Sequence, residues 1–134
     1  MGQNQSIKVI ITKIGLDAHD RGALVVANLL KEAGLEVVYL GRFQTPEGIV
    51  KTAIEEDADV IGLSCMSPNH VLLIPDVIEL LKKECLDDIL VIAGGIIPDP
   101  YASQLRDAGV SEIFGAATPS QQIIDFIHSN VRVK

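Results

Sequence analysis

The sequence predicts an α/β fold in which a five-stranded parallel sheet is covered by helices on both faces. Short runs rich in Ile, Val and Leu alternate along the 134 residues with segments of helical periodicity. Breaks rich in Gly, Pro and Asp separate the two kinds of segment. Right-handed crossovers between parallel strands then favour a doubly wound, flavodoxin-like sheet with strand order 2-1-3-4-5.

The expected strands are continuous apolar runs and do not alternate with polar residues. In the first run, Val9, Ile10 and Ile11 follow one another, which is typical of a strand that is buried on both faces. The fourth run is followed directly by Gly94 and Gly95, and these end it. The five expected strands cover residues 7–14, 35–40, 59–64, 89–93 and 111–114.

The expected helices are marked by apolar residues spaced three and four apart and by end signals. Gly34 is placed to end the first helix, and Thr45-Pro46-Glu47 supplies an N-cap, a first-turn proline and a first-turn acid to the second. The expected helices cover residues 22–33, 45–57, 71–84 and 100–108, with a last one that Thr118 and Pro119 cap. The side chains expected to face inward are Ala23, Val26, Ala27, Leu30, Ile49, Val50, Ala53, Ile54, Leu73, Val77, Leu80, Leu81, Ile123, Ile124 and Ile127.

Composition limits the class of protein. With 48% apolar residues and no linker or low-complexity stretch, residues 1–134 are expected to form one domain. The net charge of −7 and the absence of a basic stripe argue against nucleic acid or an anionic membrane surface as a partner. No apolar run reaches the roughly 18 residues of a spanning helix, and the polar start does not resemble a secretory signal. Cys65 and Cys85 form no CxxC pair, which favours the reducing cytoplasm.

Three unusual loops are expected to meet at one edge of the sheet. In open α/β sheets, ligands bind outside the carboxyl ends of the strands, here between the first and third strands. The loops at residues 15–22, 64–70 and 94–100 each follow a predicted strand. This edge is therefore the expected ligand site.

The first loop places Asp17, His19, Asp20 and Arg21 before Gly22. An imidazole in such a loop can bind a metal through one nitrogen while a carboxylate accepts a hydrogen bond from the other. Asp17, two residues before His19, can be that acceptor. The same residues also fit a structural role, in which Asp17 or Asp20 caps the helix and His19 is exposed to solvent.

The second and third loops supply small polar groups and glycines. Ser64, Ser67 and Asn69 suit hydrogen bonds to a ligand, although a helix N-terminus capped by Ser67 or Asn69 would explain them too. Gly94 and Gly95 after a buried strand indicate close approach of the backbone to a ligand or to a packed helix.

Other chemistries find little support in the sequence. It contains neither GxGxxG nor GxxxxGK[ST], so a dinucleotide site and a P-loop are not indicated. Cys65 and His70 could form a nucleophile and base, but no third group orients them. A receiver-like signalling domain should end its third strand with a phosphoacceptor Asp, and this chain has Ser64 near that position.

Together, Asp17-x-His19-x-x-Gly22, Ser64-x-Met66 and Gly94-Gly95 resemble the DxHxxG…SxL…GG pattern of B12-binding domains. The resemblance extends from Ile7 to about Ile127. The string at residues 13–22, and Thr45-Pro46-Glu47, resemble the acyl-CoA mutase branch, which holds methylmalonyl-CoA mutase and small subunits such as that of 2-hydroxyisobutyryl-CoA mutase. Ala18 stands where this branch usually has Gly, Met66 where the motif has Leu, and Ala117 near a further Gly of the branch.

The resemblance implies that His19 is the lower ligand of the cobalt in cobalamin, which is held base-off with its nucleotide tail in a slot beside the sheet. Asp17 would accept the hydrogen bond of the imidazole, and Lys13 would contact Asp17, so that Asp17, His19 and Lys13 form the catalytic relay. Ser64 would bond the benzimidazole. The implied cofactor-binding residues are Asp17, His19, Asp20, Arg21, Gly22, Ser64, Met66, Gly94, Gly95, Phe114 and Thr118.

The resemblance further implies an adenosylcobalamin-binding small subunit of an acyl-CoA carbon-skeleton mutase, an isomerase that is inactive alone. A large barrel-type partner subunit would bind and select the acyl-CoA. The alternative is a stand-alone corrinoid carrier or B12 sensor, which would bind cobalamin without a barrel partner.

Overall fold

The computed structural model describes residues 7–14, 21–65, 73–86, 88–95, 97, 99–115 and 118–131. The strands are β1 (Lys8–Ile14), β2 (Glu36–Gln44), β3 (Val60–Cys65), β4 (Leu90–Gly95) and β5 (Glu112–Gly115). The helices are α1 (Arg21–Glu32), α2 (Pro46–Glu56), α4 (Ile74–Lys83), α5 (Asp99–Ala108) and α6 (Ser120–Asn130).

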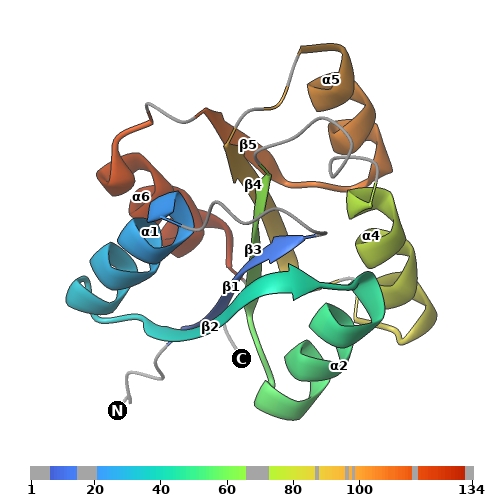
Figure 1. Ribbon diagram of the computed structural model, residues 1–134, viewed down its shortest axis with the longest axis horizontal. Coiled ribbons are helices and arrows are strands. Elements are labelled where there is room, and N and C mark those ends of the chain that lie inside the picture. Colours follow the sequence, from blue (N-terminus) through green and yellow to red (C-terminus); the bar gives the residue numbers. More distant parts are fainter. Residues whose placement is uncertain are drawn as a thin grey trace.

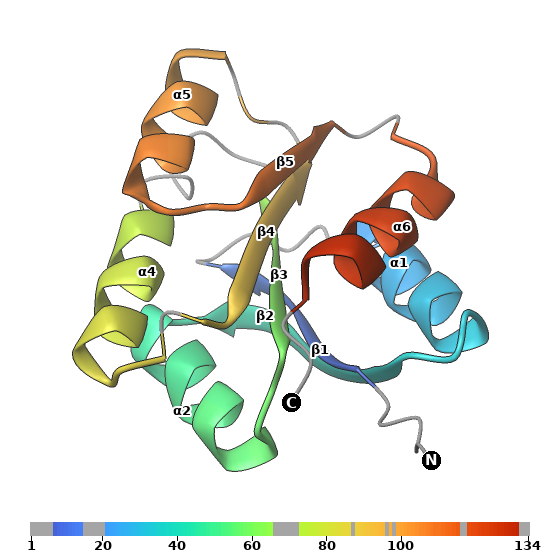
Figure 2. The same ribbon diagram turned by 180° about the vertical axis from the view of Figure 1, so that it is seen from behind.

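The five strands form one parallel sheet in the order β2-β1-β3-β4-β5, which confirms the predicted topology. Helices α1 and α6 lie side by side on one face, and α2, α4 and α5 cover the other (Figures 1 and 2). Because every strand connection crosses over one of the faces, the apolar runs of the central strands β1, β3 and β4 are buried on both sides, while those of the edge strands β2 and β5 are half-buried.

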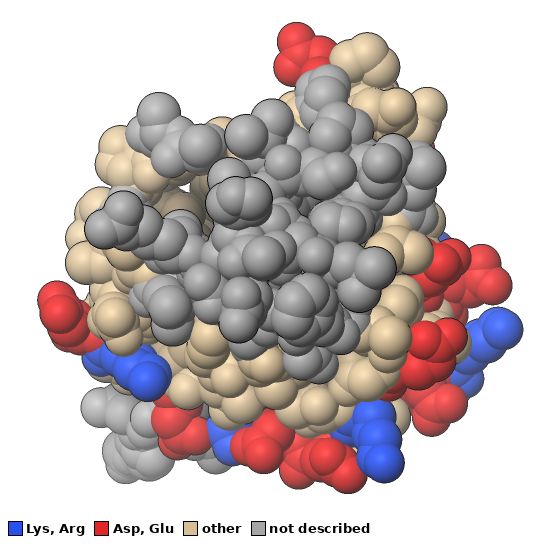
Figure 3. All heavy atoms as spheres, viewed as in Figure 1, with Lys and Arg blue, Asp and Glu red and all other residues tan. Residues whose placement is uncertain are grey.

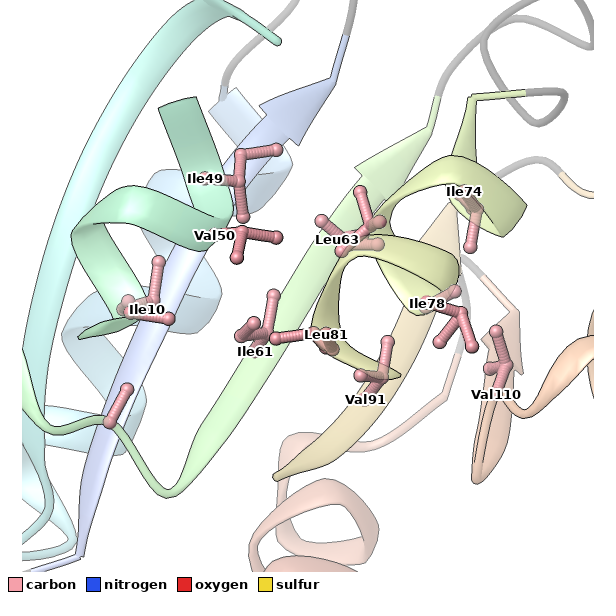
Figure 4. Close-up of a cluster of buried hydrophobic side chains, with 14 of the residues drawn as sticks. Ile10, Ile49, Val50, Ile61, Leu63, Ile74, Ile78, Leu81, Val91 and Val110 are labelled. Carbon is pink, nitrogen blue, oxygen red and sulfur yellow. The ribbon is translucent and has the colours of Figure 1, made fainter. Parts of the chain in front are cut away.

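Two hydrophobic clusters, one on each face, hold the helices to the sheet. Along β1, Val9 and Ile11 point to the α1 and α6 side while Ile10 points to the other, in accordance with the two-residue period of a strand. Figure 4 shows the larger cluster, where side chains of β3 and β4 meet those of α2 and α4. The smaller cluster joins the sheet to Ala27 and Leu30 of α1 and to Ile127 of α6.

The end signals of α1 and α2 act as the sequence predicts. The N–H of Gly48 donates to Thr45 Oγ1 at 3.1 Å, and Pro46 occupies the first turn of α2. Gly34 has φ of +95°, and the N–H of Leu35 donates to the carbonyl of Leu30 at 3.1 Å. This bond closes α1 in a Schellman motif, in which a glycine adopts the left-handed conformation at lowest cost.

Strand β2 is longer than its apolar run, which ends at Leu40. Ile11 pairs with Tyr39, but the next residue of β1, Thr12, pairs with Gly41, so Leu40 is an extra residue on β2. The strand therefore continues through a bulge to Gln44, where the sequence suggested a loop.

Two local expectations are wrong. Ile54 was expected to face the core but is 49% exposed, because the buried stripe of α2 runs through Pro46, Ile49, Val50 and Ala53 and Ile54 lies beside it in the last turn. Thr118 does not cap α6. The N-cap is Pro119, without a side-chain hydrogen bond, and the N–H of Thr118 donates to the carbonyl of Gly115.

Charges of both signs are interleaved on the surface. Lys8 Nζ lies 3.3 Å from Glu36 and from Glu56, which ties β1 to β2 and α2 at the amino ends of the strands. On the face seen in Figure 3, blue and red side chains likewise alternate around the lower rim, with no single-sign patch among the described residues. None of the helices within the described ranges is long and apolar enough to cross a membrane.

The packing of the core predicts that replacing a buried isoleucine destabilises the protein far more than replacing a half-exposed one. Ile61→Ala should lower the free energy of unfolding by about 2–5 kcal/mol, since Ile61 is fully buried between β3 and α4. Ile54→Ala, at the half-exposed position, should cost less than about 1 kcal/mol. Urea unfolding with unchanged m-values measures both, and equal losses would contradict this account of the core.

Candidate functional site

Four residues singled out from the sequence form one row across the carboxyl ends of the strands. Lys13 pairs with Ser64, Ser64 with Gly94, and Gly94 with Phe114, so the row runs from β1 through β3 and β4 to β5. Gly95 lies in the next row, between Cys65 and Gly115. Residues from four separate segments are thereby brought to one edge of the sheet, as the fold class predicts.

A cavity of about 160 Å³ opens beside this row, lined by residues of the sheet together with Val26 of α1 and Ile123 of α6. Five of the predicted cofactor-binding residues line it, namely Ser64, Gly94, Gly95, Phe114 and Thr118. The other lining residues are Ile11, Val26, Gly62, Leu63, Ile92, Ala93, Gly115 and Ile123. The cavity is therefore formed at the place where the sequence predicts a ligand.

The space exists because glycines replace side chains on this face of the sheet. In β3 the residues facing α1 and α6 are Val60, Gly62 and Ser64, at the two-residue period. Gly94 occupies the neighbouring position on β4, and a Cβ there would lie 3.4 Å from the carbonyl oxygen of Phe114. The helices approach from the opposite side with Val26 of α1 and Ile123 of α6.

The lining suits a flat apolar ring with a few hydrogen-bonding groups. The side chains are aliphatic or aromatic apart from the hydroxyls of Ser64 and Thr118, and none is charged. Ser64 is the next to last residue of β3, and Thr118 follows β5. An aromatic ring buried here would lose water at little cost, while its polar edge could meet a hydroxyl.

Contacts outside the cavity hold the β5 wall in place. The rings of Phe114 and Phe126 meet edge to face, with centroids 5.7 Å apart and planes at 79°. Arg106 donates to Glu112 at 2.8 Å, and this guanidinium holds the pKa of the Glu112 carboxyl below its ordinary value, with help from the N–H of Ile113. Phe114 is thus fixed by α6, and β5 is fixed by α5.

Backbone curvature at the end of β4 requires glycine. Gly95 has φ of +109°, a conformation that residues with a side chain rarely adopt. The strand can turn at this residue while its backbone still lines the cavity. The two glycines are therefore needed for different reasons. Gly94 leaves space beside the cavity, and Gly95 allows a backbone conformation that other residues rarely adopt.

The predicted metal ligand, His19, lies outside the part of the chain that the structure describes. So do the predicted cofactor-binding residues Asp17, Asp20 and Met66, and the departures at Ala18 and Ala117. Arg21 and Gly22 open α1, directly after the Asp-x-His segment. Within the described ranges, no group of three or more His, Cys, Asp or Glu side chains could hold a metal ion. The roles of His19, Asp17 and Lys13 therefore remain predictions.

The list of cofactor-binding residues predicted from the sequence lacked the other eight lining residues: Ile11, Val26, Gly62, Leu63, Ile92, Ala93, Gly115 and Ile123. Most are core side chains, and their position at the cavity depends on how the helices pack. Gly62 could have been found from the sequence, because a glycine inside an apolar strand often marks a place where a ligand or another backbone segment comes close to the strand.

Comparison with known proteins identifies the family. The family model described as "B12 binding domain" matches residues 7–125. The chain belongs to the B12-binding domain family. The 2-hydroxyisobutanoyl-CoA mutase small subunit of Aquincola tertiaricarbonis is 45% identical, over 96% of this chain and 94% of that protein. The pivalyl-CoA mutase small subunit of Xanthobacter autotrophicus is 44% identical, over 90% of this B12-binding chain and 81% of that protein.

A solved structure supports the fold of this B12-binding chain. A cobalamin-binding protein from Desulfitobacterium hafniense superimposes with a TM-score of 0.82 at 22% identity, over 96% of this chain. The chain spans 60% of that protein. At this identity the likeness confirms the five-stranded α/β architecture.

Proposed function

We propose that this chain is the cobalamin-binding small subunit of an adenosylcobalamin-dependent acyl-CoA carbon-skeleton mutase. The observation that carries the proposal is its similarity, at 45% and 44% identity and over most of both chains, to two proteins that are themselves mutase small subunits. A large barrel-type partner would bind the acyl-CoA. We place the subunit in the cytoplasm, where an exposed free thiol such as Cys85 persists.

The cavity supports cobalamin as the ligand. Cobalamin carries a nucleotide tail that ends in a flat dimethylbenzimidazole, and the cavity has apolar walls of matching character beside the carboxyl ends of the strands. Ser64 would donate a hydrogen bond to the base, and Gly94, Gly95, Phe114 and Thr118 would line the slot.

The segment between β1 and α1 would bind the corrin side of the cofactor. His19 would be the lower cobalt ligand, with Asp17 accepting from the other ring nitrogen and Lys13 holding the carboxylate. Asp20, Arg21 and Gly22 would contact the tail as it passes the start of α1, and Met66 would contact it after β3. Because the tail occupies the cavity, its base is kept away from the cobalt and the cofactor is bound base-off.

The cofactor supplies a carbon radical by homolysis of its cobalt–carbon bond. The residues of this chain would bind and orient it. The carboxylate of Asp17 would keep the imidazole of His19 in one tautomer and raise its basicity toward the metal. Contacts with the acyl-CoA would come from the partner.

The binding mode is testable by EPR. Purified chain labelled with 15N and loaded with cob(II)alamin should show hyperfine coupling from a protein nitrogen, since His19 is expected to replace the benzimidazole. Unlabelled chain with the same cofactor is the control, and its coupling pattern should be that of 14N. Coupling that stays 14N in the labelled sample would come from the cofactor's own base and would contradict ligation by His19.

A further inference from the structure

The cavity has a mouth and a floor, set by two rows of the sheet. Ser64 belongs to the row at the carboxyl ends of the strands. Two residues earlier, Ile11, Gly62 and Ile92 pair with one another in a second row, roughly 6.6 Å nearer the amino ends. All three residues of this second row line the cavity. A ligand that enters past Ser64 therefore ends at Gly62.

Gly62 faces the cavity, on the opposite side from the larger core cluster. Ile61 and Leu63, its neighbours in β3, point toward α4 in Figure 4. A Cβ at Gly62 would lie 2.8 Å from Ile11 Cδ1 and 3.7 Å from Ile92 Cγ1, the two side chains that flank it on the floor. The floor is thus already in close contact on both sides, and a Cβ at Gly62 would have to push the Ile11 methyl aside, into the cavity that Ile11 also lines.

We propose that Gly62 is a specificity-determining residue: by carrying no side chain, it makes the cavity deep enough for a benzimidazole-type base at the end of a corrinoid's nucleotide tail. The inference rests on the proposed function, because it takes that tail as the occupant. Apolar cavities of about 150 Å³ hold a single benzene ring. At about 160 Å³ this cavity is only slightly larger, and the two-ring benzimidazole is larger than benzene, so such a base would need its full depth.

An alanine at this position should fold and still close the floor. The short contact is with Cδ1, the free end of the Ile11 side chain, which can rotate away without moving the backbone. The rotated Cδ1 methyl of Ile11 and the new methyl of the alanine would both take up space at the floor of the cavity. Overpacking of this kind typically costs 1–3 kcal/mol, which corresponds to about 5- to 150-fold in affinity if the bound ring must meet it.

The experiment compares corrinoids with and without the tail. Dissociation constants of cobalamin and of cobinamide, which lacks the nucleotide and its base, are measured by absorbance for the full chain and for Gly62→Ala. We expect Gly62→Ala to bind cobalamin at least about 10-fold more weakly and to bind cobinamide within about 2-fold of wild type. Ile61→Val, on the other face of β3, is the matched control and should change neither constant.

A second measurement is made in the Ile11→Val background, which lacks the Cδ1 that the new methyl would strike. There Gly62→Ala should cost less cobalamin affinity than it does in the wild-type chain, because one methyl fewer crowds the floor. Unchanged cobalamin binding by Gly62→Ala, or an equal loss for both corrinoids, would overturn the role of Gly62 and leave the proposed function standing. Failure of the wild-type chain to bind either corrinoid would overturn both.

Discussion

The isolated chain, given adenosylcobalamin and a panel of acyl-CoA thioesters, should give no mutase turnover, and turnover should appear only when its large partner subunit is added. A primary carbon radical must be shielded from water and oxygen, and closed active sites provide that shield. In this chain the described helices pack on the two faces of the sheet, while the cavity lies at the carboxyl ends of the strands. The partner would therefore supply both the cover and the acyl-CoA site.

The assay needs two controls, the chain alone and the partner alone, each with the cofactor. The expected difference is between undetectable turnover in both controls and full activity in the mixture. Turnover by the isolated chain would refute its assignment as a dependent subunit. A stable cobalamin complex that never associates with a barrel protein would favour a corrinoid carrier or sensor.

Most of the fold could be predicted because its signals are local. Five apolar runs and the helix-end residues Gly34 and Thr45 fixed the order of elements, and the crossover rule then limited the strand order. The errors arose where tertiary packing decides. Leu40 is an extra residue in the pairing of β2 with β1, and Ile54 lies beside the buried stripe of α2 and is exposed to solvent.

The candidate site was predictable only in part, for a related physical reason. Ser64, Gly94 and Phe114 could be found because each ends a parallel strand, and such ends meet at one edge. Val26 and Ile123 could not, because their helical pattern is that of any core residue. Only the placement of α1 and α6 against the part of the sheet face that holds Gly62 and Gly94 turns these two residues into cavity walls.

Asp17→Asn should lower cobalamin affinity or mutase turnover by about 10- to 100-fold, the usual cost of altering a hydrogen-bond partner of a metal-ligating histidine. The amide keeps the size of the carboxylate but loses its charge, so the imidazole of His19 becomes a weaker base. Cobalamin affinity of the chain and turnover of the assembled enzyme measure the effect.

The matched control for this substitution is Asp88→Asn, which makes the same chemical change beside the amino ends of β3 and β4, away from the cavity. It should leave both quantities unchanged, since its carboxylate lies at the opposite edge of the sheet from the proposed cobalt site. If Asp17→Asn behaved like Asp88→Asn, the relay from Lys13 through Asp17 to His19 would be wrong, and His19 would have to bind cobalt without a charged hydrogen-bond partner. A loss confined to Asp17→Asn, with unchanged urea unfolding of both variants, would instead separate a role in cofactor binding from a role in the fold.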